Sequence, residues 1–174
     1  MRVFAYCCAS MLERTRRAAG MYPRLCPPIN VACIAPRTLE GYDLLYLMLH
    51  GMPDQPFLYG DRWETALSAE TVRSANLAGS VVYSGACYLA ESPMLPAFLE
   101  AGAVVIGGSG RNYSVKGGFD LVDLLGQWVR YGLAAGLTPE RALRLGKARL
   151  RLGRISKERR DTLKFEMWVP GVKA

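Results

Sequence analysis

Residues 42–51, Tyr-Asp-Leu-Leu-Tyr-Leu-Met-Leu-His-Gly, decide the fold. The unbroken apolar run from Leu44 to Leu49 is short for a helix and typical of a strand that is covered on both faces of a parallel sheet. A glycine follows directly and a proline soon after, which ends the strand. His50, the only histidine among 174 residues, is therefore predicted at the carboxyl end of a buried strand, the edge where open α/β sheets bind ligands.

A second apolar run, residues 80–86, ends in the same manner and is followed by Cys87. If the two strands are neighbours, the imidazole of His50 and the thiol of Cys87 meet at one edge of the sheet. A thiol becomes a nucleophile when it ionises, and an imidazole can accept its proton. Either residue alone is compatible with a purely structural role, so their joint occurrence favours a catalytic dyad.

The rest of the chain alternates strand-like and helix-like segments. Strands are expected at residues 2–8, 31–35 and 103–106, with a final edge strand at 163–169 that suits antiparallel pairing. Helices are expected at 12–19, 68–74, 93–101, 119–135 and 139–152. This order predicts an α/β fold, with a mostly parallel sheet of about six strands covered by helices on both faces, in a single domain over residues 1–174.

Composition narrows the possible functions. Apolar residues make up 51% and charged residues 21% of the chain, which indicates a folded core rather than disorder. No apolar run approaches the roughly 20 residues that span a bilayer, and the start lacks a signal-peptide pattern, so we expect a cytoplasmic protein with no membrane partner. One histidine and five cysteines without zinc-site spacing predict no metal site.

Positive charge is concentrated in one segment. The formal net charge is +7, and residues 141–160 hold nine basic residues and one acidic residue, so the remainder is close to neutral. Such a segment is typical of a solvated helix face, and it is also compatible with a nucleic-acid-binding surface. Aromatic residues for base stacking are not interleaved with the basic ones, which makes a nucleic-acid partner the less favoured interpretation.

Several motifs resemble one known family. They are Leu-Tyr-Leu-Met-Leu-His-Gly at 45–51, Leu-Tyr-Gly-Asp at 58–61 and Leu-Ala-Gly-Ser-Val-Val-Tyr-Ser-Gly-Ala-Cys at 77–87, continued at 97–107, 131–133 and 136–143. Together they resemble the caspase-like cysteine peptidases of clan CD, and most closely the CHAT domains. The resemblance covers roughly residues 40–150.

The resemblance implies a caspase-like three-layer α/β sandwich and peptide-bond cleavage. It implies His50 as the general acid and base, Cys87 as the nucleophile and the Gly51 amide as part of the oxyanion hole. It also implies that no metal or organic cofactor is needed, and that a regulatory partner protein or a homodimer controls the activity. A catalytically inactive member of the same fold, acting as a binding or assembly module, is the alternative.

Clan CD peptidases select the residue before the scissile bond, and a charge in the substrate pocket would achieve this because a mismatched side chain leaves it unpaired. Asp54, Asp61 and Glu91 are candidates that would favour a basic residue, whereas Arg111 would favour an acidic one. The three carboxylates lead us to expect a basic preference.

Overall fold

The protein is described by a computed structural model that covers residues 1–25, 34–112, 119–152 and 157–171, with no side-chain description at 157–159. Its centre is a six-stranded sheet with the order β2-β1-β3-β7-β8-β9. All neighbouring pairs are parallel except β8 and β9, which are antiparallel. The strands are β1 (Val3–Cys7), β2 (Arg24–Leu25), β3 (Leu44–Met48), β7 (Val81–Ser84), β8 (Val104–Gly107) and β9 (Glu166–Trp168).

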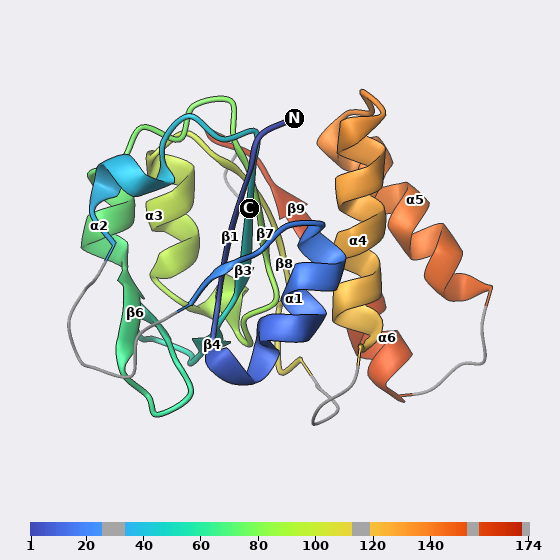
Figure 1. The fold of residues 1–174 in the computed structure, drawn as a ribbon, viewed down its shortest axis with the longest axis horizontal. Helices are drawn as coiled ribbons and strands as arrows, with labels where there is room; N and C mark the ends of the chain where they lie inside the picture. The colour runs from blue at the N-terminus through green and yellow to red at the C-terminus, as the bar shows by residue number, and fades with distance from the viewer. Residues whose placement is uncertain (26–33, 113–118, 153–156, 172–174) are drawn as a thin grey trace.

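Helices cover both faces of this sheet (Figure 1). One face carries α2 (Ala69–Arg73) and α3 (Met94–Glu100), and the other carries α1 (Leu12–Ala19), α4 (Leu121–Ala134), α5 (Pro139–Arg151) and α6 (Lys157–Leu163). Because β3 is buried over its whole length, its alternate side chains feed two separate apolar cores, one on each face. Short 3-10 turns lie at Ala9–Met11, Pro36–Leu39 and Leu89–Glu91.

The direction of strand order reverses between β1 and β3. From β1 the chain first adds β2 on one side and then β3 on the other, which makes this position a topological switch point, where open α/β sheets bind ligands beyond the carboxyl ends of the strands. The pairing continues past the strand ends, because the Cys8 amide donates to Met48 (3.1 Å) and the Gly85 amide donates to Leu47 (2.9 Å).

A second, three-stranded antiparallel sheet stands at this edge. It consists of β4 (His50–Gly51), β5 (Phe57–Tyr59) and β6 (Thr65–Ser68), in the order β4-β5-β6. The sequence predicts His50 at the end of the long buried strand, and the structure places it two residues beyond Met48, the last residue of β3, where it begins the small sheet. The chain therefore turns out of the main sheet at Leu49 and carries the imidazole with it.

Most predicted elements are confirmed, including the antiparallel final strand and the helix stop at Gly20, whose φ of 71° suits glycine. The strand expected at 31–35 is not confirmed: residues 31–33 lie outside the described part, and residues 34–35 are not in a strand. Its place at the edge is taken by β2, which the sequence did not predict. Helix α6 was also not predicted.

None of the described helices combines the length and the apolar content needed to cross a membrane. The cytoplasmic location and the single-domain organisation stay predictions.

Candidate active site

A cavity of about 670 Å³ opens at the carboxyl ends of β3 and β7. Its lining comes from six regions: the end of β3 with β4, the turn after β7, the start of α1, the loop after β8, the turn between β5 and β6, and the start of α4. His50, Gly51, Cys87 and Arg111 all line it. Four of the seven residues singled out from the sequence therefore face one space.

Gly51 brings the two halves of the predicted dyad together. A Cβ atom at this position would lie 2.3 Å from the carbonyl oxygen of Cys87 and 3.2 Å from the Cβ of Ala86. No residue with a side chain could approach so closely, and the backbone of β4 therefore packs directly against the turn that carries the thiol. The register of the main sheet pairs Leu47 with Ser84, so the segments that lead to His50 and to Cys87 leave β3 and β7 side by side.

The Cys87 thiol is half-buried and held by one neighbour. The amide of Asn112 donates to its Sγ (3.3 Å), and the thiol donates to the Asn112 carbonyl (3.5 Å). Burial raises the pKa of Cys87, while the hydrogen bond from Asn112 and the charge of Arg111 oppose the rise without cancelling it. The resting sulfur is therefore a thiol, and it needs a proton acceptor before it can attack.

Asn112 is the residue that sequence reasoning missed. Its side-chain amide donates to the carbonyls of Gly85 (3.1 Å) and Ala86 (2.9 Å), so both its backbone and its side chain hold the Cys87 turn. A Cβ atom at Gly108 would lie 2.7 Å from Asn112 Oδ1, which shows that this glycine makes room for the clamp. The glycine-rich run 107–110 was the available signal.

Backbone strain is concentrated around the cavity. Tyr88, directly after the thiol, has a φ of 55°, and Trp63, opposite it in the lining, has a φ of 63°. Non-glycine residues in this left-handed region cost on the order of 1 kcal/mol or more and gather at functional sites. The Tyr88 amide donates to the Gly110 carbonyl (2.8 Å), which helps to hold the strained turn.

His50 faces Asp61 on its other side. Its Nε2 atom lies 3.9 Å from Asp61 Oδ1, and its ring centroid lies 5.6 Å from that of Trp63. Asp61 accepts hydrogen bonds from the Ser10 amide (3.0 Å) and from the Ser10 hydroxyl. Burial alone would raise the pKa of Asp61, but these hydrogen bonds and the nearby imidazole lower it below its usual value. Asp61 is therefore a fixed carboxylate beside the imidazole.

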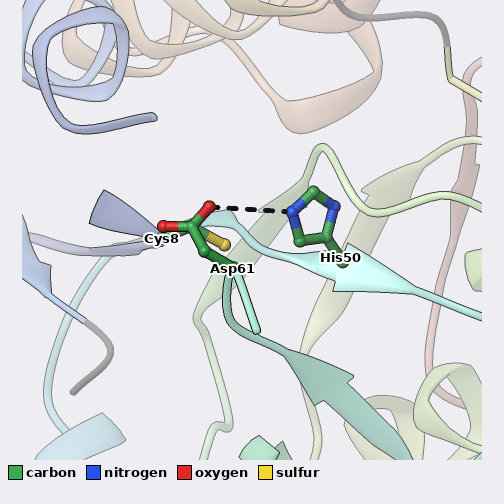
Figure 2. A group of neighbouring side chains, drawn as sticks. All are labelled: Cys8, His50 and Asp61. Carbon is green, nitrogen blue, oxygen red and sulfur yellow. Dashed lines mark ion pairs between the residues drawn. The ribbon is translucent and has the colours of Figure 1, made fainter. Parts of the chain in front are cut away.

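A second thiol lies on the same side as Asp61. Ligand atoms of Cys8, His50 and Asp61 all lie within 4.8 Å of one another, as Figure 2 shows. Cys8 is fully buried, and its thiol donates to the Tyr59 carbonyl (3.5 Å). The sequence argument against a metal site assumed that one histidine and scattered cysteines do not converge with further ligands. In the structure, the switch point and the small sheet bring a sulfur, a nitrogen and a carboxylate oxygen together.

The inner wall of the cavity contains a buried ion cluster. Arg14 lines the cavity and pairs with Asp120 and with Asp123 (Nε to Oδ2, 2.7 Å), both of which are buried at the start of α4. Burial, together with the neighbouring Asp120, raises the pKa of Asp123 to about 6, although Arg14 opposes the rise. Arg14 is thus largely neutralised by partners behind the cavity wall.

The predicted pocket carboxylates lie elsewhere. Asp54, Asp61 and Glu91 are not among the described residues that line the cavity. Asp54 and Glu91 are exposed and are joined through their backbones, with the Asp54 amide donating to the Glu91 carbonyl (3.1 Å). Of the four residues proposed for substrate selection, only Arg111 lines the cavity.

One similar solved structure is that of gingipain R, an Arg-specific cysteine proteinase. The two share 14% sequence identity with a TM-score of 0.53, and the match covers 92% of this chain and 44% of that one. This likeness confirms the predicted caspase-like α/β fold, and this chain spans less than half the length of that protein. No protein-family model and no curated protein matches the chain.

Proposed function

We propose that this protein is a cysteine endopeptidase that uses Cys87 as nucleophile and His50 as acid and base. One observation carries the proposal: the only histidine and a half-buried cysteine, on segments that touch through Gly51, line one cavity at the carboxyl edge of the sheet. The fold is one that a known cysteine proteinase also uses. Fold alone does not define chemistry, so the argument depends on the site.

The reaction follows from the protonation states of the two groups. His50 accepts the proton of the Cys87 thiol, and the thiolate adds to the carbonyl carbon of the scissile peptide. When the tetrahedral intermediate collapses, the C–N bond breaks and His50 gives its proton to the leaving amine. Water, deprotonated by His50, then attacks the thioester and releases the carboxylate product and the Cys87 thiol.

Cys87 is the better nucleophile of the two cysteines near His50. It lines the cavity and is partly accessible, whereas Cys8 is fully buried and is not part of the described lining. A substrate backbone can reach a sulfur only where the sulfur faces open space. The different surroundings of the two thiols therefore assign the covalent step to Cys87.

Two neighbours complete the chemistry. Gly51 lines the cavity directly beside Cys87, so its backbone amide is the candidate to stabilise the oxyanion. Asn112 is a positioning residue, because it holds the turn of Cys87 through three hydrogen bonds that it donates. Asp61 is a second positioning residue, since its carboxylate lies 3.9 Å from the Nε2 atom of the imidazole.

Charge in the cavity supports an acidic rather than a basic residue before the scissile bond. Arg111 and Arg14 line the cavity, and no carboxylate does so among the described residues. Residues 113–118, next to Arg111 in the chain, contain no carboxylate either. Arg14 pairs with Asp120 and Asp123. Arg111 is the lining residue whose charge acts on the Cys87 thiol, where it opposes the rise of the pKa, so we assign the preference to Arg111. The basic preference expected from Asp54, Asp61 and Glu91 gains no support from their positions.

The decisive experiment uses a panel of peptides with an electrophilic carbonyl group at the carboxyl end. Covalent modification should map to Cys87 by peptide mass spectrometry and should be fastest with Asp or Glu as the terminal residue. Faster labelling by Lys or Arg probes would contradict the proposed acidic preference but would support the proposed peptidase activity. Absence of labelling by the whole panel would favour the inactive binding module. Labelling at Cys8 would contradict the assignment of Cys87 and would make Cys8 the nucleophile.

The finer assignments belong to this proposal as well. The proposal also includes membership of the CHAT group within clan CD, control by a partner protein or a second copy, and a cytoplasmic site of action.

The described part of residues 141–160 does not favour nucleic-acid binding, because Arg149 stacks over Trp128 (4.7 Å) and Leu143 and Leu150 bury one side of α5.

A further inference from the structure

We propose that Cys8, His50 and Asp61 form a zinc site that switches the peptidase off. The three side chains come from the end of β1, from β4 and from the turn between β5 and β6, and they converge although 42 and 11 residues separate them along the chain. They offer a sulfur, a nitrogen and a carboxylate oxygen, a donor set that suits Zn²⁺ better than Mg²⁺ or Ca²⁺. Water would complete a four-coordinate site.

The spacing of the ligand atoms is close to what zinc requires. Zn–N and Zn–O bonds of about 2.0 Å and a Zn–S bond of about 2.3 Å place tetrahedral ligand atoms roughly 3.3–3.6 Å apart. His50 Nε2 and Asp61 Oδ1 lie 3.9 Å apart, and all three ligand atoms lie within 4.8 Å of one another. Figure 2 shows the Asp61 carboxylate and the Cys8 sulfur on the same side of the imidazole ring.

Outer contacts already orient the ligands. Ser10 holds both carboxylate oxygens of Asp61 through its amide and hydroxyl, an arrangement that fixes metal ligands in proteins. The Cys8 thiol donates to the Tyr59 carbonyl, and Tyr59 pairs with His50 across the small sheet. The same sheet therefore positions two of the three ligands.

Metal binding and catalysis compete for the imidazole, a consequence that rests on the proposed function. Zn²⁺ binds the Cys8 sulfur as a thiolate, and the thiol proton passes to solvent. The lone pair of His50 Nε2 is then donated to the metal, which lowers the affinity of the ring for a further proton. His50 can no longer accept the proton of Cys87, and the nucleophile remains a thiol.

The test begins with binding alone, on the purified full chain freed of metal with a chelator. Titration with Zn²⁺ in a calorimeter should give one site and the release of about one proton. Co²⁺ should give the near-ultraviolet band of thiolate-to-cobalt charge transfer. Cys8→Ser should abolish that band, and Asp61→Asn should weaken Zn²⁺ binding at least tenfold.

Matched controls separate this site from other thiols. Cys7→Ser removes the adjacent buried thiol, which faces the other core, and should leave Zn²⁺ affinity unchanged. Cys87→Ala should retain the cobalt band although it removes the proposed nucleophile. If Cys87→Ala loses the band and Cys8→Ser keeps it, the metal site is wrong. Binding with no proton release, or equal binding by all variants, also overturns it.

Inhibition is measured separately. Zn²⁺ at the concentration that saturates the calorimetric site should inhibit peptide cleavage by the Cys7→Ser control and by the unmodified chain, and a chelator should restore it. Saturation without inhibition would overturn the switch. A chain that binds Zn²⁺ at the expected residues but cleaves no peptide would contradict the proposed function and leave the metal site standing.

Discussion

Cys8 and Cys87 lie at the same edge of the main sheet, and their surroundings differ in exposure and in hydrogen-bond partners. Cys8 follows β1, is fully buried and donates to a carbonyl of the small sheet. Cys87 follows β7, lines the cavity and exchanges hydrogen bonds with Asn112. Both come from the carboxyl ends of parallel strands on either side of β3. Exposure to the cavity and the hydrogen-bonding partner of the sulfur are the grounds on which we propose Cys87 as the nucleophile and Cys8 as a metal ligand. Proximity to the histidine alone does not make this distinction.

The largest expected effect separates the two thiols by activity. Cys87→Ala should lower kcat/KM for peptide cleavage at least about 1,000-fold, because it removes the atom that attacks. Cys8→Ala should lose less than about tenfold, since no bond to substrate involves this sulfur. Cleavage of an acidic-residue peptide library measures both. Equal losses in the two variants, with both still folded by circular dichroism, would contradict the assignment of Cys87.

The alkylation rates of the two thiols should also differ, by a smaller but still large factor. Iodoacetamide should modify Cys87 at least about 100-fold faster than Cys8 in the native protein, because reactivity follows access to the thiolate. In denaturant the two rates should become similar. Time-resolved peptide mass spectrometry gives both rates in one sample, and Cys7, also fully buried, serves as an internal standard. Rapid native labelling of Cys8 would show that the two environments are alike.

The pH dependence of that reaction should sharpen the contrast further. Burial raises the pKa of Cys87 above its ordinary value, so the thiolate is the minor form at neutral pH and grows as pH rises. The alkylation rate should therefore increase about tenfold per pH unit between pH 7 and about 8.5. A plateau near neutral pH would mean that His50 and Cys87 already form an ion pair at rest.

The smallest effect concerns the clamp on the Cys87 turn. Asn112→Ala removes two hydrogen bonds to buried carbonyls and should lower the free energy of unfolding by about 1–3 kcal/mol. It should also reduce kcat more than it raises KM, since the turn and not the substrate is affected. The matched control is Asn76→Ala, at an exposed asparagine whose Oδ1 accepts a hydrogen bond from the Ala78 amide (3.2 Å). It should change the free energy of unfolding by less than about 0.5 kcal/mol. An unchanged unfolding midpoint for Asn112→Ala would show that the clamp contributes nothing.

The strands of the main sheet were predictable because their burial is written into unbroken apolar runs. Leu44–Met48 and Val81–Ser84 are covered on both faces, and such runs identify a parallel sheet without further information. The two glycines near the dyad were also informative, since close backbone approach needs them. Because His50 and Cys87 follow the ends of these apolar runs, the sequence also indicates at which edge of the sheet the site lies.

The small sheet and the clamp were not predictable to the same degree. A two-residue strand such as His50–Gly51 has too few positions to show a period, so the turn of His50 out of the main sheet was missed. Asp61 and Cys8 meet only because the β5–β6 turn folds back over the switch point, a long-range contact with no local signal. Asn112 follows a glycine run that shows where the backbone bends but not which side chain returns to the Cys87 turn.

Leu49 marks the point at which the chain passes from the main sheet to the small sheet, so His50 and Cys87 are carried by different sheets. Cys87 follows a strand of the six-stranded sheet, whereas His50 belongs to the three-stranded sheet, whose β5–β6 turn also carries Asp61 and Trp63. If His50 and Cys87 are the catalytic pair that we propose, a ligand that displaces the small sheet would alter the distance between the His50 imidazole and the Cys87 sulfur without displacing the main sheet. Under the proposed function, latency and activation of the peptidase would then depend on the conformation of the chain at Leu49 alone.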